Sequence, residues 1–394
     1  MIKFLYIIKI FVLKMSKENN INQIIFPIKK LQFEKIIDVY PLIPNLSIKV
    51  NENTFAFVCY SDERMTTYIK FVYINDKNEL IINGEYRLDD NIIEDSAFNI
   101  RQIEVKNDNL IIIVKRYLIV EKIEIKDNNF YIFKNILKNK FNENLYKILS
   151  GNKVASYIGD ILKIYHFSTN KIELLYSNKL NYTLLAQKQI KQEMKEIFIG
   201  VKPYDRLSNM IEIEERNEII ISFSRLLTFG EDDIDLTWCD YVIIIMNSKN
   251  FQIKSLLFDN LIEAEKFFYF GNNILYSFGF RSFYSLDLKC LKRELFLEEN
   301  LTSIENHYYH FNIIPFLDRH KLLSFGYYRC GYYHNRDEYK HLCECNLSEK
   351  KLKEHKIDNI FESKYSIEYF PLKYKKDMIL IFFEYELILY KINI

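Results

Sequence analysis

Asn272–Phe280 reads NNILYSFGF, and Arg319–Tyr327 reads RHKLLSFGY. Each stretch opens with a polar turn, continues as an apolar run and reaches the same three residues, Ser-Phe-Gly. Short runs rich in Ile, Leu, Phe and Tyr, bounded by Asn and other turn residues, are typical of β-strands. The pair therefore predicts a repeated unit built from strands.

The same order, a polar or Asn-bearing turn and then an apolar run, occurs seven times along the chain. The seven copies are NENTFAFVCY from Asn51, KNDNLIIIVK from Lys106, SGNKVASYIG from Ser150, ERNEIIISFS from Glu215, FGNNILYSFG from Phe270, DRHKLLSFGY from Asp318 and YKKDMILIFF from Tyr374. Their spacing of roughly 50 to 55 residues suits the blades of a β-propeller with their loops.

Further strands follow most of the apolar runs. Examples are ILKIYHFSTNKIELLY from Ile161, DYVIIIMNSKNFQIKSLLF from Asp240, SFYSLDLKCLKRELFL from Ser282 and EYKHLCECNLSEKKLKEH from Glu338. A helical period is best matched by Leu185–Phe198, LAQKQIKQEMKEIF, where one repeat is too long. We therefore expect an all-β protein with an insertion near residues 182–205.

The fold class that this pattern favours is a seven-bladed β-propeller, with six or eight blades as alternatives. Stacked blades bury the sheet faces that a single blade leaves open. The C-terminal DMILIFFEYELILYKINI supplies two strands and ends, so we expect Asn22–Ile28, NQIIFPI, to provide the outermost strand of the last blade. Two packed β-sandwich domains are the alternative that the same strands allow.

The Ile161 and Ser282 hairpins, together with the LLSFGYY strand, resemble those of kelch-type and WD40-like β-propeller proteins. The resemblance covers the chain from about residue 22 onward and implies a single propeller domain, 22–394. The sequence departs from both families. The kelch Gly-Gly doublet is reduced to Gly279, Gly326 and Ser224, and the Gly-His and Trp-Asp signatures of WD40 repeats are absent.

Charge and cysteine usage exclude several classes of partner. The 394 residues include 54 Lys and Arg against 53 Asp and Glu, so the net charge of +1 gives no field that attracts nucleic acid. The six cysteines lack the spacing of a disulfide framework or a zinc module. We expect a cytoplasmic protein without a cofactor and without a nucleic-acid partner.

Residues 1–21 form a separate N-terminal segment, either a leader or an extension from a start codon placed too early. MIKFLYIIKIFVLK is interrupted by Lys9 and is too short to span a bilayer, and Met15 begins MSKENN. Membrane association is expected only if residues 1–14 are retained and act as an anchor.

CGYYHNRDEYKHLCEC, residues 330–345, gathers Cys330, His334, His341, Cys343 and Cys345. Zinc takes four such N and S donors. In an extended strand the last three would share one face with Tyr339 and Leu347, which is an ordinary packing face. We therefore expect core packing here and no metal site.

FGEDDIDLTWCD, Phe229–Asp240, is an acidic segment with the single tryptophan of the chain. Asp233, Thr237 and Trp238 fall where the Asp-box of sialidase-like propellers places Asp, Thr and Trp. Glu231 and Asp235 depart from that motif, and the segment is expected to precede a strand pair rather than cap a hairpin. A glycosidase also needs a positioned pair of carboxylates, which nothing here singles out.

Two long loops between second and third strands, Leu226–Cys239 and Tyr327–Asp337, are the expected binding surface, on either side of a recess. Tyr and Arg are favoured at binding hot spots. The candidate partner-binding residues are Asp232, Asp233, Asp235, Trp238, Tyr328, Arg329, Tyr332, Tyr333, His334 and Arg336.

Phosphate-binding loops and the G-x-S-x-G nucleophile motif are absent from the sequence, and no residue is singled out as catalytic. The expected function is a non-enzymatic scaffold that binds another protein through one propeller face. The alternative is a propeller enzyme or a glycan-binding module that uses the acidic loop 229–240.

Overall fold

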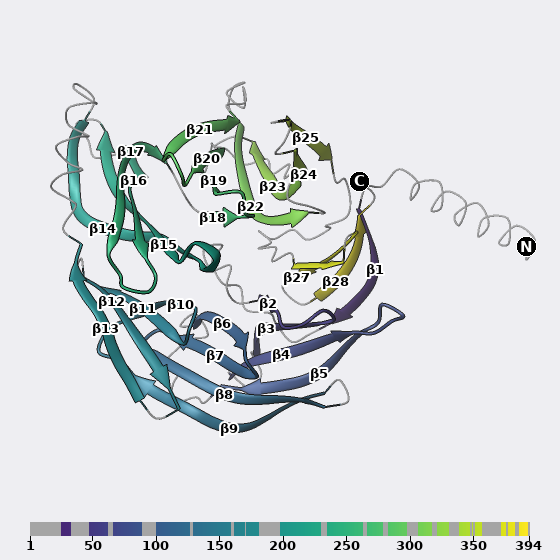
Figure 1. The fold of residues 1–394 in the computed structure, drawn as a ribbon. Coiled ribbons are helices and arrows are strands. Elements are labelled where there is room, and N and C mark those ends of the chain that lie inside the picture. The colour runs from purple at the N-terminus through teal and green to yellow at the C-terminus, as the bar shows by residue number, and fades with distance from the viewer. Residues whose placement is uncertain are drawn as a thin grey trace, which may run out of the picture. The chain divides into compact units, whose positions relative to one another are not determined.

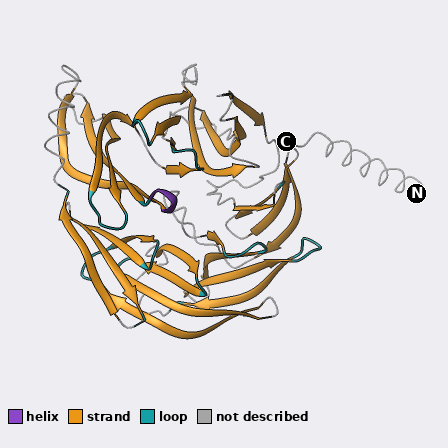
Figure 2. Ribbon diagram, in the orientation of Figure 1, coloured by secondary structure: helices purple, strands orange, loops and turns teal. Residues whose placement is uncertain are grey.

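The computed structural model of the chain consists almost entirely of β-strands (Figures 1 and 2). It describes residues 25–32, 47–61, 66–88, 100–126, 129–158, 161–169, 171–180, 198–229, 235–262, 266–278, 283–297, 306–316, 321–330, 339–346, 349, 351–356, 372–375, 377–382 and 386–392. Within these ranges the helical element is one 3-10 turn, η2 (Glu214–Arg216), purple in Figure 2. The helix predicted from Leu185 lies outside the described residues, except that its last residue begins a strand.

The described strands form seven four-stranded sheets, and six of them follow the chain order. Those six are β2 (Ser47–Lys49), β3 (Thr54–Ser61), β4 (Thr66–Ile74), β5 (Leu80–Arg87); β6 (Ile100–Lys106), β7 (Asn109–Val114), β8 (Tyr117–Lys126), β9 (Asn129–Lys140); β10 (Leu145–Leu149), β11 (Lys153–Ile158), β12 (Ile161–Ser168), β13 (Lys171–Lys179); β14 (Phe198–Ile213), β15 (Glu218–Phe229), β16 (Asp235–Asn247), β17 (Ile253–Ile262); β18 (Lys266–Tyr269), β19 (Ile274–Phe278), β20 (Phe283–Asp287), β21 (Lys292–Leu297); and β22 (Asn306–Phe316), β23 (Lys321–Cys330), β24 (Tyr339–Asn346), β25 (Lys351–Lys356).

The remaining sheet joins the two ends of the chain. Its order is β1 (Ile25–Gln32), β28 (Glu386–Ile392), β27 (Met378–Phe382) and β26 (Leu372–Lys375). The N-terminal strand β1 pairs antiparallel with β28, with Leu31 opposite Leu387. Repeated four-stranded sheets of this kind are propeller blades. The predicted β-propeller and its closure by an N-terminal strand are therefore confirmed.

Each apolar run of the sequence repeat is the second strand of its sheet. The opening stretch provides β19, and its counterpart after Arg319 provides β23. The first strand of each sheet is an additional element that the repeat did not reveal. Some of these strands are too short or too polar to stand out, such as β2 with its three residues.

Asparagine recurs in the turns before the second strands because the backbone there is left-handed. The turn pairs Asn107-Asp108, Gly151-Asn152 and Asn272-Asn273 all have positive φ, with values of 50 and 57, 63 and 55, and 58 and 61 degrees. Two successive residues of positive φ make the type I′ hairpin turn, which Asn, Asp and Gly tolerate best. The polar part of the repeat is thus a turn signal.

One hydrogen bond recurs in five of the sheets and ties this turn to the third strand. The carbonyl of the residue just before the second strand accepts from a backbone N–H at or near the end of the third strand. The bonds are Ile74 to Asn53 at 2.8 Å, Ile123 to Asp108 at 2.8 Å, Phe167 to Asn152 at 2.9 Å, Ser248 to Asn217 at 3.0 Å and Leu288 to Asn273 at 2.7 Å. The turn, second strand and third strand therefore form one rigid repeat.

The chain divides into two compact units. The first comprises Met1–Leu88, Lys126–Phe130 and His310–Ile394, and the second comprises Asp89–Ile125 and Tyr131–Tyr309. In the first unit, Phe55 and Phe57 of β3 pack with Leu387 and Leu389 of β28 in one buried cluster. The N-terminal and C-terminal ends of the unit thus share a hydrophobic core.

In the second unit, buried clusters link successive sheets. Ile113 of β7 packs with Val154 of β11, and Ala155 of β11 packs with Ile221 of β15. Ile220, from the opposite face of β15, packs with Leu275 of β19. Alternate residues of a central strand thus serve two neighbouring sheets, as the two-residue period of a strand requires.

Candidate functional site

The acidic segment differs from the predicted loop. β15 extends to Phe229 and β16 begins at Asp235, so most of Leu226–Cys239 is strand. Trp238 lies in β16 opposite Leu226. The prediction of a long loop was wrong because Leu226, Leu227 and Thr237 continue the hairpin ladder, despite the nearby charges. Asp232 and Asp233 lie outside the described residues.

The same segment joins two paired strands, so the prediction that it precedes a strand pair was also wrong. β15 and β16 pair antiparallel up to Phe229 and Asp235, and residues 230–234 connect them. The acidic residues therefore belong to a hairpin connection between the second and third strands of their sheet.

The aromatic and basic segment is divided between strands and a connection. Tyr328 and Arg329 lie in β23, which extends to Cys330, so the first part of the predicted loop Tyr327–Asp337 is strand. Tyr328 is opposite Tyr339, the first residue of β24. Tyr332, Tyr333, His334 and Arg336 lie outside the described residues, as does the recess expected beside them.

The cysteines and histidine expected to share a packing face do lie on one strand. His341, Cys343 and Cys345 occupy alternate positions of β24, as predicted.

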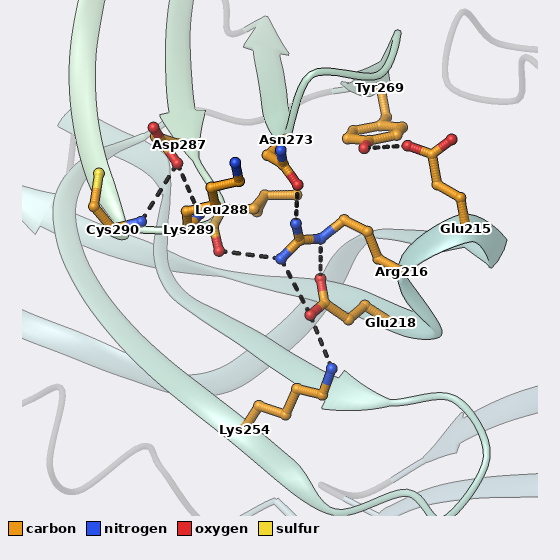
Figure 3. A network of polar contacts seen from close by, with 10 residues as sticks. All are labelled: Glu215, Arg216, Glu218, Lys254, Tyr269, Asn273, Asp287, Leu288, Lys289 and Cys290. Carbon is orange, nitrogen blue, oxygen red and sulfur yellow. Dashed lines mark hydrogen bonds and ion pairs between the residues drawn. The ribbon is translucent and has the colours of Figure 1, made fainter.

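A polar cluster is centred on Arg216, at the end of η2 (Figure 3). Arg216 Nε donates to Glu218 Oε2 at 2.6 Å, and Nη2 donates to the carbonyl of Leu288 at 3.2 Å. Nη1 donates to Asn273 Oδ1. Because Asn273 and Leu288 belong to the next sheet, one guanidinium ties two sheets together, and sequence spacing gave no sign of this.

Glu218 is the carboxylate at the middle of this cluster. Its side chain is 7% exposed, and Lys254 Nζ of β17 donates to its Oε1 at 2.9 Å. Burial alone would raise the pKa of Glu218, but the bonds from Arg216 and Lys254 outweigh burial and lower it. Glu218 therefore remains charged and serves as a fixed acceptor.

Two further bonds border the cluster in Figure 3. The Tyr269 hydroxyl donates to Glu215 Oε1, and burial together with this bond raises the pKa of Tyr269. The Asp287 carboxylate accepts from the backbone N–H of Lys289 at 2.7 Å, which lowers the pKa of Asp287. Both carboxylates are thus engaged in holding turns.

A second cluster connects the sheet β10–β13 to the sheet β14–β17. Glu212 accepts from the backbone N–H of Ser150 and, at 2.6 Å, from the Ser150 hydroxyl. Lys153 Nζ lies 3.4 Å from Glu212 Oε1 and donates to the Ser248 carbonyl at 3.0 Å. This cluster, like the first, sits at a turn between first and second strands.

A third cluster lies within the sheet β10–β13. The Tyr165 hydroxyl and the Lys163 ammonium both donate to Glu143, the latter at 3.1 Å. Burial would raise the pKa of Glu143, yet these hydrogen bonds lower it. Burial and the bond to Glu143 raise the pKa of Tyr165 well above its usual value. A phenol held this way is a poor proton donor or base near neutral pH.

First strands carry a fourth group of charges. Lys106 Nζ at the end of β6 lies 3.4 Å from Glu214 Oε1 of η2. Burial lowers the pKa of Lys147 on β10, and the charge of Glu104 on β6 opposes that shift. Burial also raises the pKa of Glu104 itself. Opposite charges thus lie along β6 and β10, the first strands of successive sheets, and Glu214 of η2 faces the end of β6.

These clusters share one chemical character. The carboxylates of the first three clusters accept hydrogen bonds from side chains and backbone of the same cluster, which leaves them satisfied within the fold. General acid–base or nucleophilic catalysis instead needs a group aimed at a substrate. The clusters described here therefore act as ties between strands and sheets.

No family model and no curated protein matches the chain. A chain of the Mitotic Checkpoint Complex crystal structure is similar in fold, with a TM-score of 0.55 and 9% identity over 94% of this chain and 95% of that chain. The C-terminal WD40 domain of Sif2 has a TM-score of 0.48 at 9% identity, over 94% and 99% of the two chains. A europium-containing methanol dehydrogenase has a TM-score of 0.47 at 8% identity, over 91% and 77%.

Identities this low show the fold alone. At that level the resemblance to β-propeller repeat proteins is confirmed, and the resemblance to kelch proteins in particular stays a prediction. Among the described residues, no helix is both long enough and apolar enough to cross a membrane.

Proposed function

We propose that this protein is a non-enzymatic scaffold in the cytoplasm that binds another protein through connections between the second and third strands of its sheets. The observation that carries the proposal is the hairpin of β23 and β24. Its paired strands end at Tyr328 and Tyr339, and the segment between them contains Tyr332, Tyr333 and Arg336. Tyr and Arg are the residue types that dominate protein-binding hot spots.

Two further observations support the proposal. The described carboxylates with lowered pKa values, Glu143, Glu218 and Asp287, accept hydrogen bonds within the fold, as structural groups do. The chain of similar fold in the Mitotic Checkpoint Complex structure belongs to a complex. A fold of repeated rigid blades with variable connections suits a role as an assembly platform.

The test is recovery of a partner at defined stoichiometry. Tagged wild-type chain and the triple variant Tyr332→Ala, Tyr333→Ala, Arg336→Ala would be incubated with extract from the source cells and analysed by size-exclusion chromatography with light scattering. The control is Lys249→Ala, Lys289→Ala, in exposed turns at the opposite ends of third strands. The proposal expects a complex that the triple variant loses and the control retains. Equal recovery with all three proteins would refute this binding surface.

One structural observation favours the alternative function, a glycan-binding module or propeller enzyme. Residues 230–234, three of them acidic, connect two paired strands, and an Asp-box also caps a hairpin. The measurement is a glycan-array and glycosidase screen of wild type against Asp233→Asn. A signal that this substitution removes would favour the alternative over the scaffold.

A further inference from the structure

The outer strand β13 (Lys171–Lys179) is the most open of the strands whose burial is described along their whole length. It is last in the hydrogen-bonded order β10-β11-β12-β13, so its outer edge faces away from its sheet (Figure 1). Seven of its nine residues are exposed. By comparison, four of the eight residues of the outer strand β5 are exposed. An outer strand of this kind presents backbone N–H and C=O groups that another strand can pair with.

The middle of β13 is apolar. Leu174 is 50% exposed and Leu175 is 43% exposed, two of the six large hydrophobic residues described as exposed. Leu175 is the extra residue of a β-bulge, because Tyr165 pairs with Leu174 while Ile164 pairs with Tyr176. Ile172 and Tyr176 pack into different clusters although they lie four residues apart, so the bulge interrupts the alternation of the strand at Leu174 and Leu175. The two adjacent leucines give an added strand one apolar contact point.

The strand is also held rigidly at its two inward residues. Ile172 packs against the buried cluster shared with β7 to β12, and Tyr176 packs against the cluster shared with β15 and β16. The Tyr176 and Phe251 rings lie 5.5 Å apart. An edge that is already ordered loses little conformational entropy on binding, which favours pairing.

The charged residues around β13 determine which kind of segment could pair with it. Lys171 and Lys179 mark the ends of β13, and Lys138 and Lys140 are exposed on β9, whose Ile136 and Leu137 pack in the same cluster as Ile172. Glu173 is the acidic residue of β13 and pairs with Lys171 at 3.2 Å. The surroundings of this edge are therefore basic, whereas the whole chain has a net charge of only +1.

We propose that β13 is a second binding surface, which adds an extended, acidic segment of a partner protein as a further β-strand beside Leu174 and Leu175. Backbone hydrogen bonds would supply the affinity, the leucines would contact apolar residues of the segment, and the lysines would select its acidic residues. This surface is separate from the connections of the proposed function, and either can fail without the other.

The probe is a nine-residue peptide of alternating Val and Glu, acetylated and amidated at its ends, which matches β13 in length. Two peptides serve as controls: one with Lys in place of Glu, and one N-methylated at alternate amides to remove the donors on one edge. Binding would be measured by fluorescence anisotropy, and hydrogen exchange would locate it. The proposal expects slower exchange across Lys171–Lys179 and at least tenfold weaker binding of both control peptides.

The variant is Leu174→Glu, Leu175→Glu, and its matched control is Ile81→Glu, Ile82→Glu on the outer strand β5, where both isoleucines are exposed. The proposal expects at least a tenfold loss of affinity in the first variant and none in the second. No binding to wild type, equal losses in both variants, or undiminished binding of the N-methylated peptide would overturn it. A dimer that the β13 variant alone abolishes would show instead that a second copy of this chain covers the edge.

Discussion

Gly84 of β5 lies directly against Phe130 of β9. A Cβ atom added to Gly84 would lie 2.6 Å from the Cβ of Phe130, and the Phe130 ring stacks on Phe71 with centroids 4.3 Å apart. A contact under 3.0 Å with an atom next to the backbone cannot be relieved by a rotamer change.

Gly84→Ala is therefore expected to force the two strands apart. Overpacking of a well-packed core costs about 1–3 kcal/mol. The measurement is the free energy of unfolding in urea. Gly151→Asn is the control, since Gly151 has a φ of 63 degrees and nothing closer than 3.8 Å to an added Cβ, and Asn tolerates that conformation. A Gly84→Ala protein as stable as wild type would contradict the packing described here.

Arg216→Lys tests the tie between two sheets. A lysine keeps the charge but loses the planar fork that reaches Glu218, Asn273 and the Leu288 carbonyl together. Leaving buried acceptors unsatisfied costs about 1–3 kcal/mol. Urea unfolding of Lys254→Met gives the comparison, because Lys254 bonds the same carboxylate from a side chain that is 38% exposed. We expect Lys254→Met to lose less unfolding free energy than Arg216→Lys. A larger loss in Lys254→Met would show that the Arg216 guanidinium is not the main link between the two sheets.

The lowered pKa values of Glu143 and Glu218 make stability depend on pH on the acid side. Each carboxylate stabilises the folded state above its unfolded value of 4.5, and this contribution is lost as the pH falls through the lower folded value. Glu143→Gln and Glu218→Gln should each flatten the fall in unfolding free energy below pH 4.5. The raised pKa of Glu104 acts in the opposite direction, so the informative quantity is the difference between variant and wild type. If the unfolding free energy of variant and wild type fell in parallel with pH, Glu143 and Glu218 would not be the source of the acid sensitivity.

Asn217 tests the left-handed turns of the repeat. Its φ is 50 degrees, and its N–H and C=O bond to Glu214 and Ser248. Asn217→Val should destabilise the protein by about 1–2 kcal/mol, because a β-branched residue resists this conformation. Asn217→Gly should leave stability within about 0.5 kcal/mol of wild type. Thermal unfolding of the two variants would decide, and equal melting temperatures would argue against a conformational role.

The sequence predicts the fold correctly where residues close together in the chain determine the local structure, as they do in turns and apolar strands. Asn at positive φ marks the turns before the second strands β7, β11, β15 and β19, and the apolar runs that follow are the buried strands. Closure by an N-terminal strand followed from counting the strands of the last repeat. First strands such as β2 were missed, since a strand of three residues carries no period of its own.

The site was less readable. Asp235 and Trp238 were assigned to a loop on the strength of nearby charges, although pairing across the sheet continues a strand through them. Arg216 and Asn273 are 57 residues apart, and nothing local in either segment indicates that they meet. Contacts between sheets depend on tertiary packing, which overrides local residue preferences.

We propose that this propeller holds other proteins in an assembly, and native mass spectrometry of the protein isolated from its source cells can decide the matter. We expect a species heavier than the 47.7 kDa chain by one or more different polypeptides in a fixed ratio. Recovery of the chain at 47.7 kDa alone, in a preparation that hydrolyses or binds a glycan, would refute the proposal.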